Sequence, residues 1–150
     1  MTQYPRWFVP AVLALLLTVT LSGLALAPTT LAVRAEWDVP WRLAGGSRVW
    51  IAATHSAAAF AMASVIGALW SVHMRSGWRR RRQRISGLLL GTSMAALALT
   101  AVGVYYIGDD RLSALAAYGH LVLGLLAVPV FLWHWRWGRA SVVPTRRAKS

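Results

Sequence analysis

Two apolar stretches decide the fold: Ile51–Met74 (IAATHSAAAFAMASVIGALWSVHM) and Leu112–Trp135 (LSALAAYGHLVLGLLAVPVFLWHW). Each is longer than the about 20 apolar residues that a helix needs to cross a bilayer. His55 and His73 lie on the first stretch, His120 and His134 on the second, and the 150-residue chain has no other histidine. Ionisable side chains inside a membrane span are costly, so these four are the candidate functional residues.

Two further apolar blocks, Trp7–Ala27 and Ile85–Ile107, complete a set of four. Hydrophobic residues make up 57% of the chain and charged residues only 13%, which is typical of a membrane protein. We therefore predict one all-α domain over residues 1–150, an integral membrane four-helix bundle with spans at about 7–27, 49–74, 85–107 and 112–135. Ala25-Leu26-Ala27 resembles a signal-peptidase site, but Pro28 follows it and the block is long enough to span.

The net charge of +12 is distributed unevenly between the segments that flank the spans. Twelve of the 16 basic residues lie before the first block, after the second or after the fourth. The other four lie in the remaining segments, together with all four acids: Arg34, Arg42, Arg48 and Arg111 with Glu36, Asp38, Asp109 and Asp110. By the positive-inside rule both termini are cytoplasmic, which predicts a multi-pass membrane protein. Because topology explains the charge, we expect membrane lipid and no nucleic acid as a partner.

Proline and glycine predict where the helices stop or bend. Pro28, Pro40 and the Gly45-Gly46 pair predict an irregular external segment over residues 28–47, which would cap a cofactor or receive a partner. Pro129 predicts a local bend one turn before His134. The chain has no cysteine, so histidine is the remaining strong metal ligand.

The histidine spacings place two pairs at two depths. His55 and His73 are 18 residues apart, or about five turns, and His120 and His134 are 14 apart, or about four turns. The two histidines of each helix therefore share one face. Since both helices descend from the external side, His55 pairs with His120 and His73 pairs with His134.

Two imidazoles that face each other from two helices can hold the iron of a b-type haem, and four predict two haems. Small residues surround the outer pair, as a flat porphyrin requires: Ala52, Ala53, Ala57, Ala58, Ala59, Ala116, Ala117 and Gly119. The inner pair lies among tryptophans, and Gly67 and Gly91 would make room for a haem there. The two histidine spacings differ by four residues, or about 6 Å of helix rise, which helix tilt or the Pro129 bend would absorb. Four arginines near the pairs are candidate partners of haem propionates: Arg48, Arg75, Arg111 and Arg136.

Other interpretations of the histidines remain open. His73 and His134 each precede an arginine by two residues, as interfacial side chains do. A haem-free interaction or assembly subunit would use the histidines structurally, and a metal transporter would use them as ligands. The spans contain no Asp or Glu, which disfavours transport. Whether the chain is an enzyme or an electron carrier is left undecided by these patterns.

Residues 48–138 resemble the bacterial membrane-bound di-haem b-type cytochromes. The matching features are His55 and His73 on one helix, Gly119-His120 and His134-x-x-x-Gly138 on another, and Gly87, Gly91 and Gly103 between them. The spacing of His55 and His73 is longer than is usual in that family. The resemblance implies a bacterial inner-membrane protein that transfers electrons across the membrane as a cytochrome b subunit. It further implies a protein redox partner or larger complex, with quinone as a further candidate partner.

Overall fold

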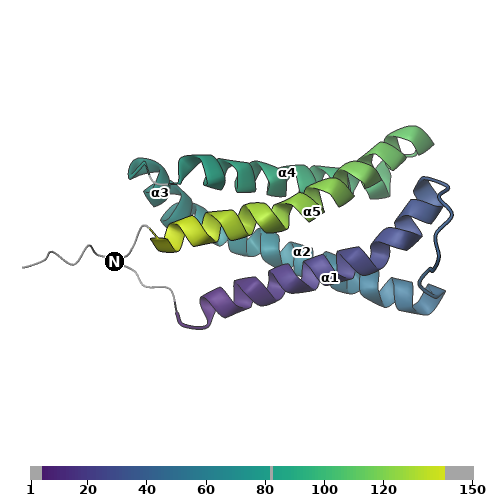
Figure 1. Cartoon of the computed structure of the whole chain (residues 1–150), viewed down its shortest axis with the longest axis horizontal. Coiled ribbons are helices and arrows are strands. Elements are labelled where there is room, and N and C mark those ends of the chain that lie inside the picture. Colours follow the sequence, from purple (N-terminus) through teal and green to yellow (C-terminus); the bar gives the residue numbers. More distant parts are fainter. Residues whose placement is uncertain (1–4, 82, 141–150) are drawn as a thin grey trace, which may run out of the picture.

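A computed structural model describes residues 5–81 and 83–140 and shows a bundle of long helices (Figure 1). The elements are α1 (Phe8–Arg34), α2 (Gly45–Leu69), a π-helical turn (Trp70–Met74), α3 (Arg75–Arg79), α4 (Arg84–Tyr106) and α5 (Asp110–Ala140). No strand occurs among these residues. Four of the helices, α1, α2, α4 and α5, are long and apolar enough to cross a membrane, which confirms the predicted all-α fold with four spans.

Of the predicted helix breakers, Pro40 lies in irregular structure as expected, whereas the prediction was wrong for Pro28 and for the Gly45-Gly46 pair. Pro28 lies inside α1, which continues to Arg34, and Gly45 and Gly46 form the first turn of α2. A helix in an apolar environment tolerates proline where neighbouring groups satisfy the backbone, and glycine costs only about 1 kcal/mol in a helix. The irregular segment is therefore shortened to residues 35–44, and Glu36, with φ of 55°, turns the chain out of α1.

The helix that carries His55 and His73 is not α-helical throughout. Five residues, Trp70–Met74, form a π-helical turn between α2 and α3, and His73 lies in it. A π turn places more residues in each hydrogen-bonded ring than an α turn, so it takes up part of the longer spacing between these two histidines. α5, in contrast, continues as one α-helix through Pro129.

Backbone contacts are densest within two antiparallel helix pairs, α1 with α2 and α4 with α5, and α1 also lies against α5. The buried residues among those described are all small: Thr29, Ala32, Ala58, Ser86, Gly103, Ser113, Ala117 and Ala127. Large apolar side chains lie outside, such as Phe60 with 76% of its surface exposed. Small interior residues with a large apolar exterior are what packing of helices in lipid favours.

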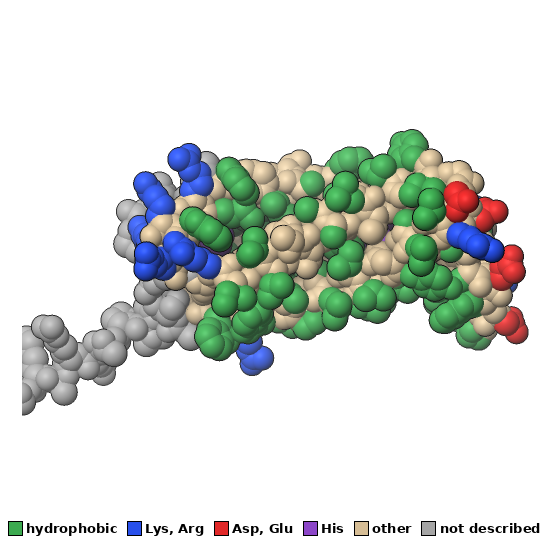
Figure 2. Space-filling model, turned by 90° about the horizontal axis from the view of Figure 1, so that it is seen from above, with side chains coloured by type: hydrophobic (Ala, Val, Ile, Leu, Met, Phe, Trp, Pro, Cys, Tyr) green, Lys and Arg blue, Asp and Glu red, His purple; other side chains and the backbone are tan. Residues whose placement is uncertain are grey.

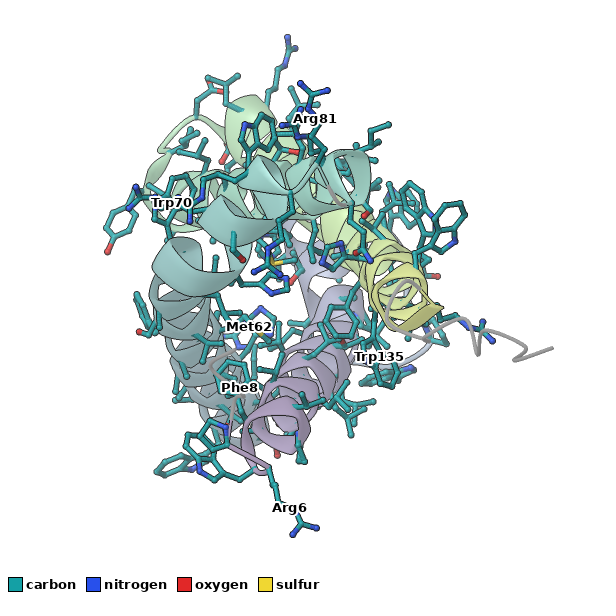
Figure 3. The ribbon with its side chains drawn as sticks, turned by 90° about the vertical axis from the view of Figure 1, so that its left-hand side faces the viewer. Arg6, Phe8, Met62, Trp70, Arg81 and Trp135 are labelled. Carbon is teal, nitrogen blue, oxygen red and sulfur yellow. The ribbon has the colours of Figure 1, made fainter. Side chains whose placement is uncertain are left out.

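Charge separates the two ends of the bundle. Arginines gather at one end and acids at the other (Figure 2). The basic end is where α1 begins and α5 ends (Figure 1). Seen from that end, Arg6 and Arg81 lie at opposite edges of the bundle and Trp70 lies at its outer rim (Figure 3).

Candidate functional site

The four histidine side chains form two pairs between α2 with its π turn and α5. The ring centroids of His55 and His120 are 6.2 Å apart, and those of His73 and His134 are 6.0 Å apart. The ring planes are close to perpendicular in both pairs, at 72° and 76°. These are the partners that the depth argument predicts, so the structure brings together all four candidate ligands, two at each level.

The separation of the rings suits two bonds to one metal ion. An imidazole nitrogen bonds a metal ion at about 2.0 Å and lies about 1.1 Å in front of its ring centre, so two rings on opposite sides of one ion have centres about 6.3 Å apart. Both pairs match this distance within a few tenths of an ångström. This separation suits ligation of one ion by both rings, and it also lies within the range of about 4.5–7 Å for edge-to-face contact between rings.

His55 is held by a helix that carries no histidine. Its Nδ1 lies 3.0 Å from Ser22 Oγ and 3.1 Å from the Val19 carbonyl oxygen, both on α1. A carbonyl only accepts, and Ser22 gives its own hydrogen to the Thr18 carbonyl at 2.6 Å, so Nδ1–H must be the donor. This fixes the tautomer and leaves the Nε2 lone pair for a metal ion, as in metal-ligating histidines generally.

His120 is held in the same way by α4. Its Nδ1 lies 3.0 Å from Thr100 Oγ1 and 3.1 Å from the Leu97 carbonyl oxygen. Thr100 donates its hydrogen to the Ala96 carbonyl at 2.8 Å, so it too accepts from the imidazole. In both cases the hydroxyl lies three residues after the accepting carbonyl, which gives the outer pair two matching clamps, one on each side.

The inner pair is clamped on one side. His134 Nδ1 lies 2.9 Å from Ser86 Oγ, and Ser86 is a buried residue of α4 that donates to the Gln83 carbonyl. Within residues 5–81 and 83–140 the His73 ring has no hydrogen-bond partner, and the side chain is exposed. At the inner site, a hydrogen bond therefore orients the His134 ring, whereas only the backbone positions His73.

Glycines let α1 and α4 approach the rings. A Cβ on Gly23 would lie 3.1 Å from His55 Cε1, and a Cβ on Gly87 would lie 3.7 Å from His134 Cε1. Gly91, expected to make room at the inner level, faces the end of the Met74 side chain. A Cβ on Gly67, the other glycine expected to make room there, would meet nothing within 4 Å, and Gly67 is exposed.

The few ligands at each level favour a metal ion that brings additional ligands, as haem iron does in its porphyrin. No group of three or more His, Cys, Asp and Glu side chains gathers in the described part of the chain. A zinc site needs three or four protein ligands, whereas a haem iron takes four nitrogens from the porphyrin and needs only two axial ligands. Two nitrogens per level, bordered by glycine and alanine, fit haem better than a bare ion.

The segment of residues 35–44, between α1 and α2, lies against the acidic end of α5. The Trp37 and Tyr118 rings are 6.2 Å apart, and Tyr118 precedes His120 by two residues. The Leu43 amide donates to Thr29 Oγ1 at 3.3 Å, which ties the other end of the segment to α1. The four arginines proposed as propionate partners, in contrast, are exposed at the ends of the helices: Arg48, Arg75, Arg111 and Arg136.

Comparison with protein-family profiles, with curated proteins and with solved structures found no match.

Proposed function

We propose that the chain is a membrane cytochrome that holds two b-type haems and carries electrons between the two ends of the bundle. His55 with His120 would ligate the outer haem and His73 with His134 the inner one. The observation that carries the proposal is the separation of the paired rings, 6.2 and 6.0 Å, which matches two axial bonds to one iron.

The bound haems supply one-electron chemistry, and the chain's own residues set the conditions for it. Ser22 and Thr100 keep the outer imidazoles in the Nδ1–H tautomer. Gly23 and Gly87 keep the space beside His55 and His134 clear. Acids at one end and arginines at the other bias the two sites in opposite directions, since positive charge favours the reduced, less positive form of an iron centre.

The orientation and the partners belong to the same proposal. The basic end faces the cytoplasm of a bacterium, so that both chain termini are cytoplasmic and the outer pair lies toward the external side. Electrons would pass between a quinone in the membrane and an external redox protein, with the chain acting as the membrane subunit of a larger complex. The segment with Trp37, packed on Tyr118 near His120, is the place for the external partner to dock.

Haem content and visible spectra of the purified protein test the proposal. Protein from haem-replete cells should contain two haems per chain and show a reduced b-type α band. His120→Ala should remove the outer haem alone, and His134→Ala should remove the inner haem alone. Colourless protein that co-purifies with a large complex would instead support a haem-free subunit, and bound divalent metal without haem would support transport.

Electron paramagnetic resonance offers a second, independent readout. Two ligating imidazoles with perpendicular planes leave dxz and dyz, the two highest occupied d orbitals of low-spin ferric iron, nearly equal in energy, which gives a highly anisotropic signal. The ring planes at 72° and 76° predict such a signal for both haems. A rhombic signal of the kind that parallel imidazoles give would contradict this ligand geometry.

A further inference from the structure

The two histidines of the inner pair are held very differently. His134 is half-buried, lies on a continuous α-helix and is 2.9 Å from Ser86 Oγ through its Nδ1. His73 is exposed, and no side chain or carbonyl in the described part of the chain accepts a hydrogen bond from its ring. Because a hydrogen bond to the distal nitrogen both orients and strengthens a histidine ligand, His73 is the weaker ligand of the four.

The backbone at His73 lies in a π turn that can convert to α-helical hydrogen bonding. His73 lies in the π turn Trp70–Met74, with regular α-helix on both sides. π turns are rare and are frequent at functional sites. Conversion of this turn to α geometry shifts the register by one residue, which rotates the following side chains by about 100° about the helix axis. Such a shift would carry His73 away from His134 without unfolding the helix.

We propose that His73 is a displaceable ligand, so that the inner site takes a small neutral diatomic molecule at its iron, opposite His134. This inference rests on the proposed haem function. The exchange breaks the bond from iron to His73 Nε2 and forms a bond from ferrous iron to the incoming molecule, and no electron is transferred. The outer pair is closed to exchange, since His55 and His120 are each clamped by a hydroxyl and a carbonyl.

A neutral ligand suits the surroundings on the His73 side. Met74 lies next to His73 in the π turn, and its Cε is 3.7 Å from the position that a Gly91 Cβ would take. Trp70, in the same turn, lies at the outer rim of the bundle (Figure 3). The Met74 thioether and Gly91 supply no side-chain hydrogen-bond donor and no charge to a bound ligand, and Arg75, which follows Met74, is exposed. Carbon monoxide, which binds ferrous haem without any polar partner, is therefore the appropriate probe.

Carbon monoxide added to the reduced full-length protein should bind half of the haem. The rate should level off as the gas concentration rises, because departure of His73 becomes limiting. In His73→Ala the same half should bind, with the same carbonyl spectrum but with a rate that stays proportional to the gas concentration. In the matched variant His134→Ala, which should lose the inner haem, no haem should bind carbon monoxide, because the outer pair is closed to exchange.

Each result bears on the inference. Two low-spin haems, neither of which binds carbon monoxide, would overturn the inference while leaving the proposed function intact. Binding to all of the haem in the unaltered protein would overturn the selectivity for the inner site. A wild-type carbonyl spectrum that differs from that of His73→Ala would show that another ligand leaves. Protein without haem would instead refute the proposed function itself.

Discussion

Replacement of Thr100 by valine removes one of two acceptors from the distal nitrogen of His120 and leaves the shape of the side chain almost unchanged. Thr100 Oγ1 lies 3.0 Å from His120 Nδ1, and the Leu97 carbonyl, at 3.1 Å, remains. An acceptor at Nδ1 raises the basicity of the imidazole and so stabilises ferric iron more than ferrous iron. The loss should therefore raise the midpoint potential of the outer haem.

The size of the shift follows from the shared hydrogen bond. One hydrogen bond contributes about 0.5–1.5 kcal/mol net, and the Leu97 carbonyl retains part of the interaction in the variant. The substitution should therefore change the free-energy difference between the ferric and ferrous states by about 0.5–1 kcal/mol. For a one-electron couple 59 mV corresponds to a tenfold change in the equilibrium constant, or about 1.4 kcal/mol. The expected rise is therefore about 20–40 mV.

Potentiometric titration of the α band measures this shift. Thr100→Ser should keep the wild-type potential, because it keeps the hydroxyl. Thr92→Val is the matched control, since Thr92 lies on the same helix, is exposed and bonds only to the Leu88 and Leu89 carbonyls. An outer potential that stays constant or falls in Thr100→Val, with two haems still bound, would refute the role given to this hydroxyl.

Three further predictions concern packing and orientation. Gly23→Leu should lose the outer haem while keeping the inner one, because its side chain would start 3.1 Å from His55 Cε1; Gly67→Leu, with open space around it, should keep both, and equal haem content in the two variants would contradict this. Gly103→Ala should destabilise the bundle by about 1–3 kcal/mol in detergent unfolding, since its Cβ would lie 2.9 Å from Ala116 Cβ; a second change, Ala116→Gly, should restore stability, and failure to do so would mean that another contact is responsible. The chain has no cysteine, so single cysteines report topology directly: an impermeant maleimide added to intact cells should label Asp38→Cys and not Arg79→Cys, and the reverse pattern would invert the orientation.

The sequence predicts the spans and the pairing of the histidines because both depend on quantities that run along one helix. Hydrophobic length gives the four helices, and residue spacing gives the depth of each histidine. These features led to the pairs His55–His120 and His73–His134, whose rings the structure places 6.2 and 6.0 Å apart. Their role as haem ligands stays a prediction.

The sequence does not predict the groups that hold the rings, because these depend on how neighbouring helices are rotated. Ser22, Gly23, Ser86 and Thr100 look like ordinary small residues of α1 and α4, where hydroxyls commonly bond back to their own helix. Only the rotation of each helix brings them to the histidines. One hint is the Ser22-Gly23 pair, in an apolar run whose other polar residues are Thr18 and Thr20. The π turn Trp70–Met74 is likewise not predicted from the sequence.

The clamps also explain why the two levels of the bundle differ. On α4, Ser86 of the inner clamp lies 14 residues before Thr100 of the outer clamp. On α1, the residue 14 positions before Ser22 is Phe8, whose side chain has no hydroxyl to accept a hydrogen bond. On the histidine helices, the spacing of 14 residues on α5 becomes 18 on α2, and the π turn lies within the extra length. Both departures fall on the inner level of the first helix pair, α1 and α2, and both loosen His73. A serine or threonine hydroxyl lies against Nδ1 of three histidines, His55, His120 and His134, and against none of the described ring atoms of His73, which is therefore the ligand most readily exchanged.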